Sequence, residues 1–137
     1  MQTETAENPK KSRQKEMRNI MSTTLTKAYQ LKKDGTPLTF TVTIGDAQKG
    51  VTSVTLGTSS LVSNQEGDVS LNIGADNNVA GQTLYCSTTV ADIRSETKQT
   101  DVTYQLTGGV SDFQQTLNES VANLGDVVFY GATFFLI

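Results

Sequence analysis

The stretch Leu38-Thr39-Phe40-Thr41-Val42-Thr43-Ile44 alternates apolar residues with threonines from end to end. Successive side chains of a β-strand point to opposite faces, so this spacing places the apolar side chains on one face. Turn-forming residues bound the stretch, with Asp34-Gly35-Thr36-Pro37 before it and Gly45-Asp46 after it. The pattern therefore predicts a half-buried strand, and residues 26–33 are expected to pair with it as a hairpin across the Asp-Gly turn.

The same alternation recurs along the chain and predicts further strands at residues 51–56, 69–73, 84–90 and 102–106. Residues 57–68 are expected to form a long polar connection. Residues 112–122 fit either a short helix or an irregular strand, and we favour the strand. Many short strands separated by turns are typical of an all-β domain.

The pattern of residues 127–137 predicts a strand that carries apolar side chains on both faces. The two faces are Val127, Phe129, Phe135 and Ile137 on one side, and Val128, Tyr130, Phe134 and Leu136 on the other. Such a strand is either central in a two-sheet sandwich with an interface on its outer face, or buried at an oligomer axis. The expected fold class is all-β, as an antiparallel β-sandwich or jelly-roll-like knob.

The composition excludes several classes of site. The chain has 137 residues with no His, no Trp and a single Cys, Cys86. His-dependent triads, the common zinc and haem sites and an internal disulfide scaffold are therefore excluded. The acidic residues are scattered over loops, and Asp76-Asn77-Asn78 lacks the ligand spacing of a calcium loop, which favours a turn there. We expect no enzyme, no catalytic residue, no metal and no cofactor, and we expect Cys86 to be a small core residue.

The first 21 residues differ from the rest of the chain. Basic side chains outnumber acidic ones in residues 1–21, whereas acidic side chains dominate residues 22–137, and the net charge of the whole chain is −3. This split predicts an N-terminal arm followed by a β-rich body. Asn8-Pro9 is a favourable start for a helix that would end near Met21, so the arm is expected to be helical or extended.

Three interpretations of the arm stay open: a docking segment that orders on a partner or another copy, a solvated tail, or upstream sequence ahead of a start at Met21. Under the docking interpretation, the candidate attachment residues are Lys10, Lys11, Arg13, Met17, Arg18 and Ile20. The basic residues have no interleaved aromatics, so nucleic acid is not an expected partner. The sequence has neither a long apolar run nor a secretory signal pattern, so no membrane insertion is expected.

Residues 49–73 carry a pattern of spaced Val, Leu and Gly residues. The pattern is Lys49-Gly50-Val51-Thr52-Ser53-Val54-Thr55-Leu56-Gly57-Thr58-Ser59, followed by Glu66-Gly67-Asp68-Val69-Ser70-Leu71-Asn72-Ile73. It resembles the Val-x-x-Val-x-Leu-x-Gly-Thr … Gly-x-Val-x-Leu element of fibre, head-fibre and receptor-binding proteins of tailed bacteriophages. In those proteins the element lies near a trimer axis and joins an attachment region to a distal β domain.

The resemblance implies that residues 49–73 lie at a trimer axis and that residues 81–137 form a distal sandwich. The expected oligomer interface is Val51, Val54, Leu56, Val69, Leu71 and Ile73. The long connection Ser59-Ser60-Leu61-Val62-Ser63-Asn64 and the lack of a repeat of the element favour a short knob over a long shaft.

These observations predict a virion structural protein of a bacteriophage, a head-fibre or capsid-decoration protein anchored by its arm. Its expected partners are a capsid or other virion protein and two further copies in a homotrimer, with a host-surface glycan as a further candidate. Its expected location is the virion, assembled in the host cytoplasm. The alternatives are a monomeric immunoglobulin-like or carbohydrate-binding β-sandwich module, and a tail-fibre or baseplate component.

Overall fold

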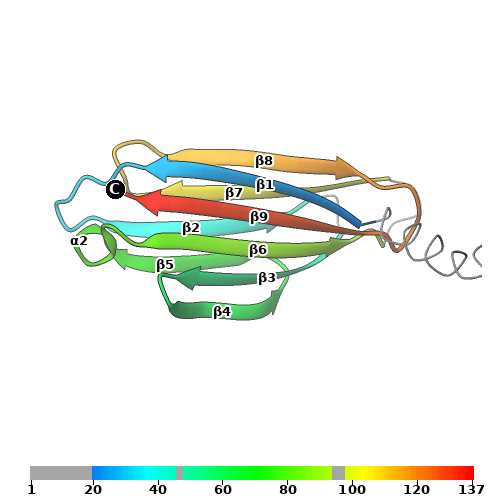
Figure 1. Ribbon diagram of the computed structural model, residues 1–137, viewed down its shortest axis with the longest axis horizontal. Coiled ribbons are helices and arrows are strands. Elements are labelled where there is room, and N and C mark those ends of the chain that lie inside the picture. The colour runs from blue at the N-terminus through cyan, green and yellow to red at the C-terminus, as the bar shows by residue number, and fades with distance from the viewer. Residues whose placement is uncertain (1–19, 46–47, 94–97) are drawn as a thin grey trace, which may run out of the picture.

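Residues 20–45, 48–93 and 98–137 are described by the computed structural model, and they form two β-sheets that pack face to face (Figure 1). The all-β sandwich expected from the sequence is therefore confirmed. Sheet A has the strand order β1-β9-β6-β3-β4, and sheet B has the order β5-β2-β7-β8.

The strands of sheet A are β1 (Ile20–Tyr29), β3 (Lys49–Leu56), β4 (Ser59–Glu66), β6 (Thr83–Ala91) and β9 (Val127–Leu136). Those of sheet B are β2 (Pro37–Ile44), β5 (Val69–Ala75), β7 (Gln99–Thr107) and β8 (Phe113–Ser120). A short helix, α2 (Asp76–Val79), follows β5. The strand expected at residues 38–44 and the strand favoured within residues 112–122 are thus confirmed as β2 and β8.

The core lies between the sheets and consists of the inward side chains that the alternation predicts. Its fully buried members include Leu38, Phe40 and Val42 of β2, Leu84, Cys86 and Val90 of β6, and Val102, Tyr104 and Leu106 of β7. Removing these apolar side chains from water is the main stabilising contribution to such a sandwich.

β9 is a central strand of sheet A, between β1 and β6. Its inner face is buried, and the Phe134 ring makes edge contacts with Phe40 and Phe113 at centroid separations of 5.6 and 5.4 Å. On its outer face, Phe129 and Phe135 are exposed. The structure therefore confirms the central position given by the first interpretation of residues 127–137, and the interface expected on the outer face stays a prediction.

The hairpin expected between residues 26–33 and β2 is wrong. Residues 20–29 form β1, which pairs in parallel with β9 in the other sheet, from Ile20 beside Val127 to Tyr29 beside Leu136. Residues 30–36 separate β1 from β2, far more than the two residues of a tight hairpin loop, and carry the chain from sheet A to sheet B. Leu31 is buried within this connection and anchors it to the core.

The long polar connection expected at residues 57–68 is also wrong. Residues 59–66 form β4, which pairs with β3 through a two-residue turn at Gly57-Thr58. Gly57 has a φ of 61°, a left-handed conformation that glycine adopts without steric cost. The pairing has two register shifts, and most of β4 is exposed, so its sequence lacks the alternation of a half-buried strand.

The expected division into an axis element at residues 49–73 and a distal sandwich at residues 81–137 does not describe the fold. β3 lies between β6 and β4, and β5 pairs with β2, so residues 49–73 are integral to both sheets of one sandwich.

β1 closes one side of the sandwich by contacting β8 of the other sheet. The Thr23 hydroxyl donates a hydrogen bond to the Glu119 carboxylate, and the Lys27 ammonium lies 5.8 Å from the centroid of the Phe113 ring. Most of the predicted arm, residues 1–19, lies outside the described residues. Ile20 and Met21, expected at the end of an arm helix, instead begin β1.

Candidate functional site

The predicted attachment residues Lys10, Lys11, Arg13, Met17 and Arg18 lie outside the described residues. Ile20 is the first residue of β1, where its backbone is in register with Val127. Attachment through these residues therefore stays a prediction.

The six predicted interface residues do not form one surface. Val54, Leu56, Val69 and Ile73 are buried in the core of the single chain, so they cannot also line an axis between copies. Val51 and Leu71 are half-buried, but Val51 lies on the outer face of sheet A, whereas Leu71 packs against the core from β5. The prediction that these side chains line a trimer axis is therefore wrong, because the sandwich of a single chain already buries most of them. The homotrimer itself stays a prediction.

Asp76 is fully buried at the start of α2 and binds the connection between the sheets. Its carboxylate accepts backbone hydrogen bonds from Lys33 at 2.7 Å and from Gly35 at 2.8 Å. Lys33 and Gly35 have φ values of 65° and 90°, left-handed conformations that turn the loop amides toward the carboxylate. Asp76 therefore has a structural role, which the sequence does not reveal because its partners lie 43 and 41 residues earlier in the chain.

A second buried polar group lies near the start of β9. The side-chain amide of Gln48 donates to Asp92 Oδ1 at 3.0 Å and to the Gln99 carbonyl at 3.2 Å, and its oxygen accepts from the Ile93 N–H at 2.8 Å. This one side chain joins the segment before β3, the end of β6 and the start of β7. Asp92, one of the scattered acidic residues, is buried in this structural network.

Cys86 is buried in the core beside hydroxyl groups, as expected from its strand position. Its Sγ lies 3.7 Å from Thr88 Oγ1, which accepts a hydrogen bond from the Tyr104 hydroxyl at 2.9 Å. Burial raises the pKa of the thiol from 9.0 to about 12, and burial likewise raises the pKa of Tyr104. Cys86 is therefore a protonated core residue rather than a reactive nucleophile.

Metal-ligating side chains are dispersed over the described part of the chain. Within residues 20–45, 48–93 and 98–137, no group of three potential metal-ligating side chains comes together. In those same ranges no helix has the length and apolar character needed to span a bilayer.

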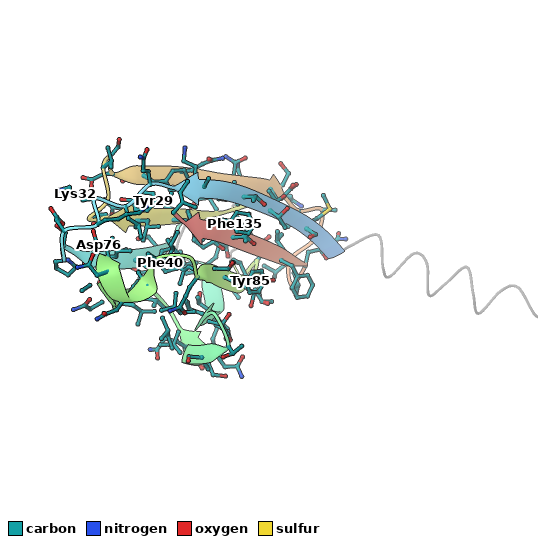
Figure 2. All side chains as sticks on the ribbon, turned by 60° about the vertical axis from the view of Figure 1, so that its left-hand side comes forward. Tyr29, Lys32, Phe40, Asp76, Tyr85 and Phe135 are labelled. Carbon is teal, nitrogen blue, oxygen red and sulfur yellow. The ribbon has the colours of Figure 1, made fainter. Side chains whose placement is uncertain are left out.

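The outer face of sheet A carries three exposed aromatic side chains. Tyr85 of β6 and Phe129 and Phe135 of β9 have exposed fractions of 47, 43 and 44%. Tyr85 and Phe135 are labelled in Figure 2. Between Phe129 and Tyr85 the surface is hollowed into an open depression with a volume of about 160 Å³. The sequence indicated an apolar outer face for β9, but placing Tyr85 beside it requires the register of β6.

Comparisons with protein-family models, with curated proteins and with solved structures find no match for this chain. By its fold, the chain is an all-β sandwich, and its edge strand β1 directly follows residues 1–19 in the sequence.

Proposed function

We propose that this chain is a structural protein of a bacteriophage particle, a head-fibre or capsid-decoration protein that is attached by its N-terminal arm. The observation that carries the proposal is where the chain enters and leaves the sandwich. It enters at Ile20, beside Val127, and its last strand ends at Leu136, beside Tyr29, at the opposite end of the long axis (Figure 1). An anchor on residues 1–21 therefore holds one end of an elongated body and leaves the other end pointing away from the particle.

The charge distribution supports the same division of roles. The arm contributes Lys10, Lys11, Arg13 and Arg18, whereas residues 22–137 have an excess of acidic side chains. A basic segment is attracted to an acidic partner surface, and the acidic body does not compete for that surface. Met17 and Ile20 are the apolar residues of the proposed attachment segment.

The proposed homotrimer uses side chains other than the four buried ones. Leu61 and Val62 of β4 and Leu71 of β5 are half-buried at the side of the sandwich opposite the β1–β8 contact. They cover the core only partly, so contact with a second copy would remove more of their apolar surface from water. We therefore assign the contact between copies to this β4–β5 side.

Purified phage particles from the host of origin test the attachment. We expect antibodies against the full chain to label the heads of intact particles and to detect the chain after density-gradient purification. Label on tails instead would support the tail-fibre or baseplate alternative. A chain found only in the soluble fraction would overturn the proposal.

Light scattering tests the oligomer, since a monomer has a mass of 14.8 kDa and the proposed trimer three times that mass. Leu71→Asp should yield monomers, whereas Val51→Asp on the outer face of sheet A should leave the mass unchanged. A monomeric wild-type chain that never accompanies particles would favour the immunoglobulin-like or carbohydrate-binding module.

A further inference from the structure

The depression between Phe129 and Tyr85 lies at a break in the outer face of sheet A. Phe129 pairs with Ser22 of β1 and Thr89 of β6, and Gly131 pairs with Thr24 and Ser87. Tyr85 is in register with Thr133, four residues along β9 from Phe129. At a rise of about 3.4 Å per residue, the backbone positions of Phe129 and Tyr85 are therefore about 14 Å apart along the strands.

The row between the two aromatic rings consists of small residues, with Gly131 at its centre on β9. Gly131 does not have a left-handed φ, so its backbone conformation does not require glycine. A Cβ at this position would lie 3.3 Å from Thr24 Cγ2 and 3.9 Å from the Cys86 carbonyl oxygen, so the Thr24 side chain would have to move slightly to admit a larger residue. Glycine inside a strand weakens the sheet and often marks a place where a ligand approaches the backbone closely. Here it leaves the floor of the depression open.

The chemistry of the lining selects the kind of ligand. Phe129 and Tyr85 offer aromatic surface at the two walls, and Ser22, Thr24 and Ser87 are hydroxyl side chains, each able to donate one hydrogen bond and accept two. Among the described residues that line the depression, none carries a charge at neutral pH. A pyranose ring has the matching surface, with apolar C–H groups on its faces and hydroxyl groups around its rim.

We propose that this depression binds a neutral pyranose residue of a glycan. The ring packs against Phe129 and Tyr85 and exchanges hydrogen bonds with the hydroxyls of Ser22, Thr24 and Ser87. The volume of about 160 Å³ is well below the roughly 300–1,000 Å³ of pockets for drug-sized ligands, so one sugar ring occupies it and the rest of the glycan extends into solvent. The site goes beyond the proposed role in the virion and does not depend on it.

The site is tested on the full chain by saturation-transfer NMR and calorimetry with a defined panel: glucose, galactose, mannose, N-acetylglucosamine and their β1,4- and α1,4-linked oligosaccharides. We expect at least one neutral sugar to bind, with saturation strongest on its ring C–H groups. Sulfated and sialylated counterparts should bind no more tightly, because the lining offers no cation. Failure of the whole neutral panel to bind would overturn the proposal.

Variants on the same face locate the site. Phe129→Ala and Tyr85→Ala should each weaken binding at least about tenfold, and Gly131→Val should abolish it by filling the floor. Phe135→Ala is the matched control, because Phe135 has the same chemistry and nearly the same exposure on the same strand face but does not line the depression. Equal loss of binding in Phe135→Ala would place the site elsewhere.

Two further readouts distinguish sugar binding in the depression from a loss of folding and from a contact between copies. The unfolding midpoints of Phe129→Ala, Tyr85→Ala and Phe135→Ala, followed by circular dichroism, should match the wild type within a few degrees, since these three side chains are exposed on the outer face. Binding that is lost in Phe129→Ala and Tyr85→Ala at unchanged midpoints supports the site, and binding that is retained overturns it. If Phe129→Ala lowers the mass measured by light scattering, the face is an interface between copies and the glycan proposal is overturned. The attachment proposal would survive either result, because it is tested on particles.

Discussion

The carboxylate of Asp76 accepts a hydrogen bond from the Gly35 N–H over 2.8 Å and thereby fixes the loop that crosses from sheet A to sheet B. The same carboxylate binds the Lys33 N–H. Because these backbone groups belong to the crossing itself, one buried side chain determines how β1 in one sheet leads into β2 in the other.

Replacing Asp76 by Ala should lower the free energy of unfolding by about 2–4 kcal/mol, because it leaves loop N–H groups without their charged acceptor. Asp34→Ala is the control, since the Asp34 side chain is exposed and accepts its hydrogen bonds from Thr36 of its own turn, while the backbone N–H that donates to Asp76 is kept in the variant. Its cost should stay below about 1 kcal/mol. Urea denaturation of both variants measures the difference, and equal losses would show that the buried carboxylate has no special role.

Truncation of two adjacent phenylalanines should lower the free energy of unfolding by very different amounts. Phe134→Ala should cost about 3–5 kcal/mol, because Phe134 is fully buried against Phe40 and Phe113. Phe135→Ala should cost well under about 1 kcal/mol, because Phe135 is 44% exposed on the outer face. Denaturation across a hundredfold range of protein concentration checks both. A midpoint that shifts with concentration for the wild type and for Phe134→Ala, but not for Phe135→Ala, would reveal an interface on that face.

Removal of residues 1–19 should change the melting temperature by only a few degrees, because this segment has few apolar side chains to contribute to a core. Removal of residues 1–29 should be severely destabilising. It takes away β1 and the buried Tyr29, whose hydroxyl donates to the Leu106 carbonyl and accepts from the Gly109 N–H. Calorimetry of the two truncated proteins measures the melting temperatures. A large drop in melting temperature after removal of residues 1–19 alone would show that the arm packs on its own body.

Stability should fall in alkaline solution. Burial raises the pKa of Cys86 from 9.0 to about 12, so the folded state keeps a proton that the unfolded chain releases above pH 9. The stabilisation from the neutral thiol is complete below pH 9 and is lost as the pH rises toward 12, at about 1.4 kcal/mol per pH unit. Cys86→Ala should therefore show a shallower decline than the wild type in urea denaturation at rising pH. If the stability of the wild type and of Cys86→Ala declines equally with pH, ionisation of Cys86 is not a cause of the decline.

Local patterns predicted the parts of the fold that depend on local geometry. Leu38 to Ile44 reads as a strand because its period of two places the apolar side chains together whatever the partner strand is. The parallel pairing of β1 with β9 joins the two ends of the described chain, and nothing within residues 20–29 specifies that partner. β4 escaped prediction because it is mostly exposed and therefore lacks an apolar face.

The candidate sites were less predictable for a related reason. The interface assigned to Val54 and Ile73 rested on the idea that these strands lacked a core of their own, but sheet packing supplies one. The depression between Tyr85 and Phe129 depends on the register of two strands some forty residues apart in sequence. Such relationships arise from tertiary pairing and have no local pattern.

The parallel arrangement of β1 and β9 also determines how the molecule bears a mechanical load. Because the strands run in the same direction, a force that pulls the start of β1 and the end of β9 apart acts along both strands. The register pairs from Ile20–Val127 to Tyr29–Leu136 are then loaded together in shear, whereas an antiparallel terminal pair pulled from its open end would separate one hydrogen bond at a time. Rupture under such a load is governed by the rate of unfolding. A body that is tethered at Ile20 and pulled from its far end should therefore resist unfolding. It should unfold at a lower force when it is pulled across the strands of sheet A than along them.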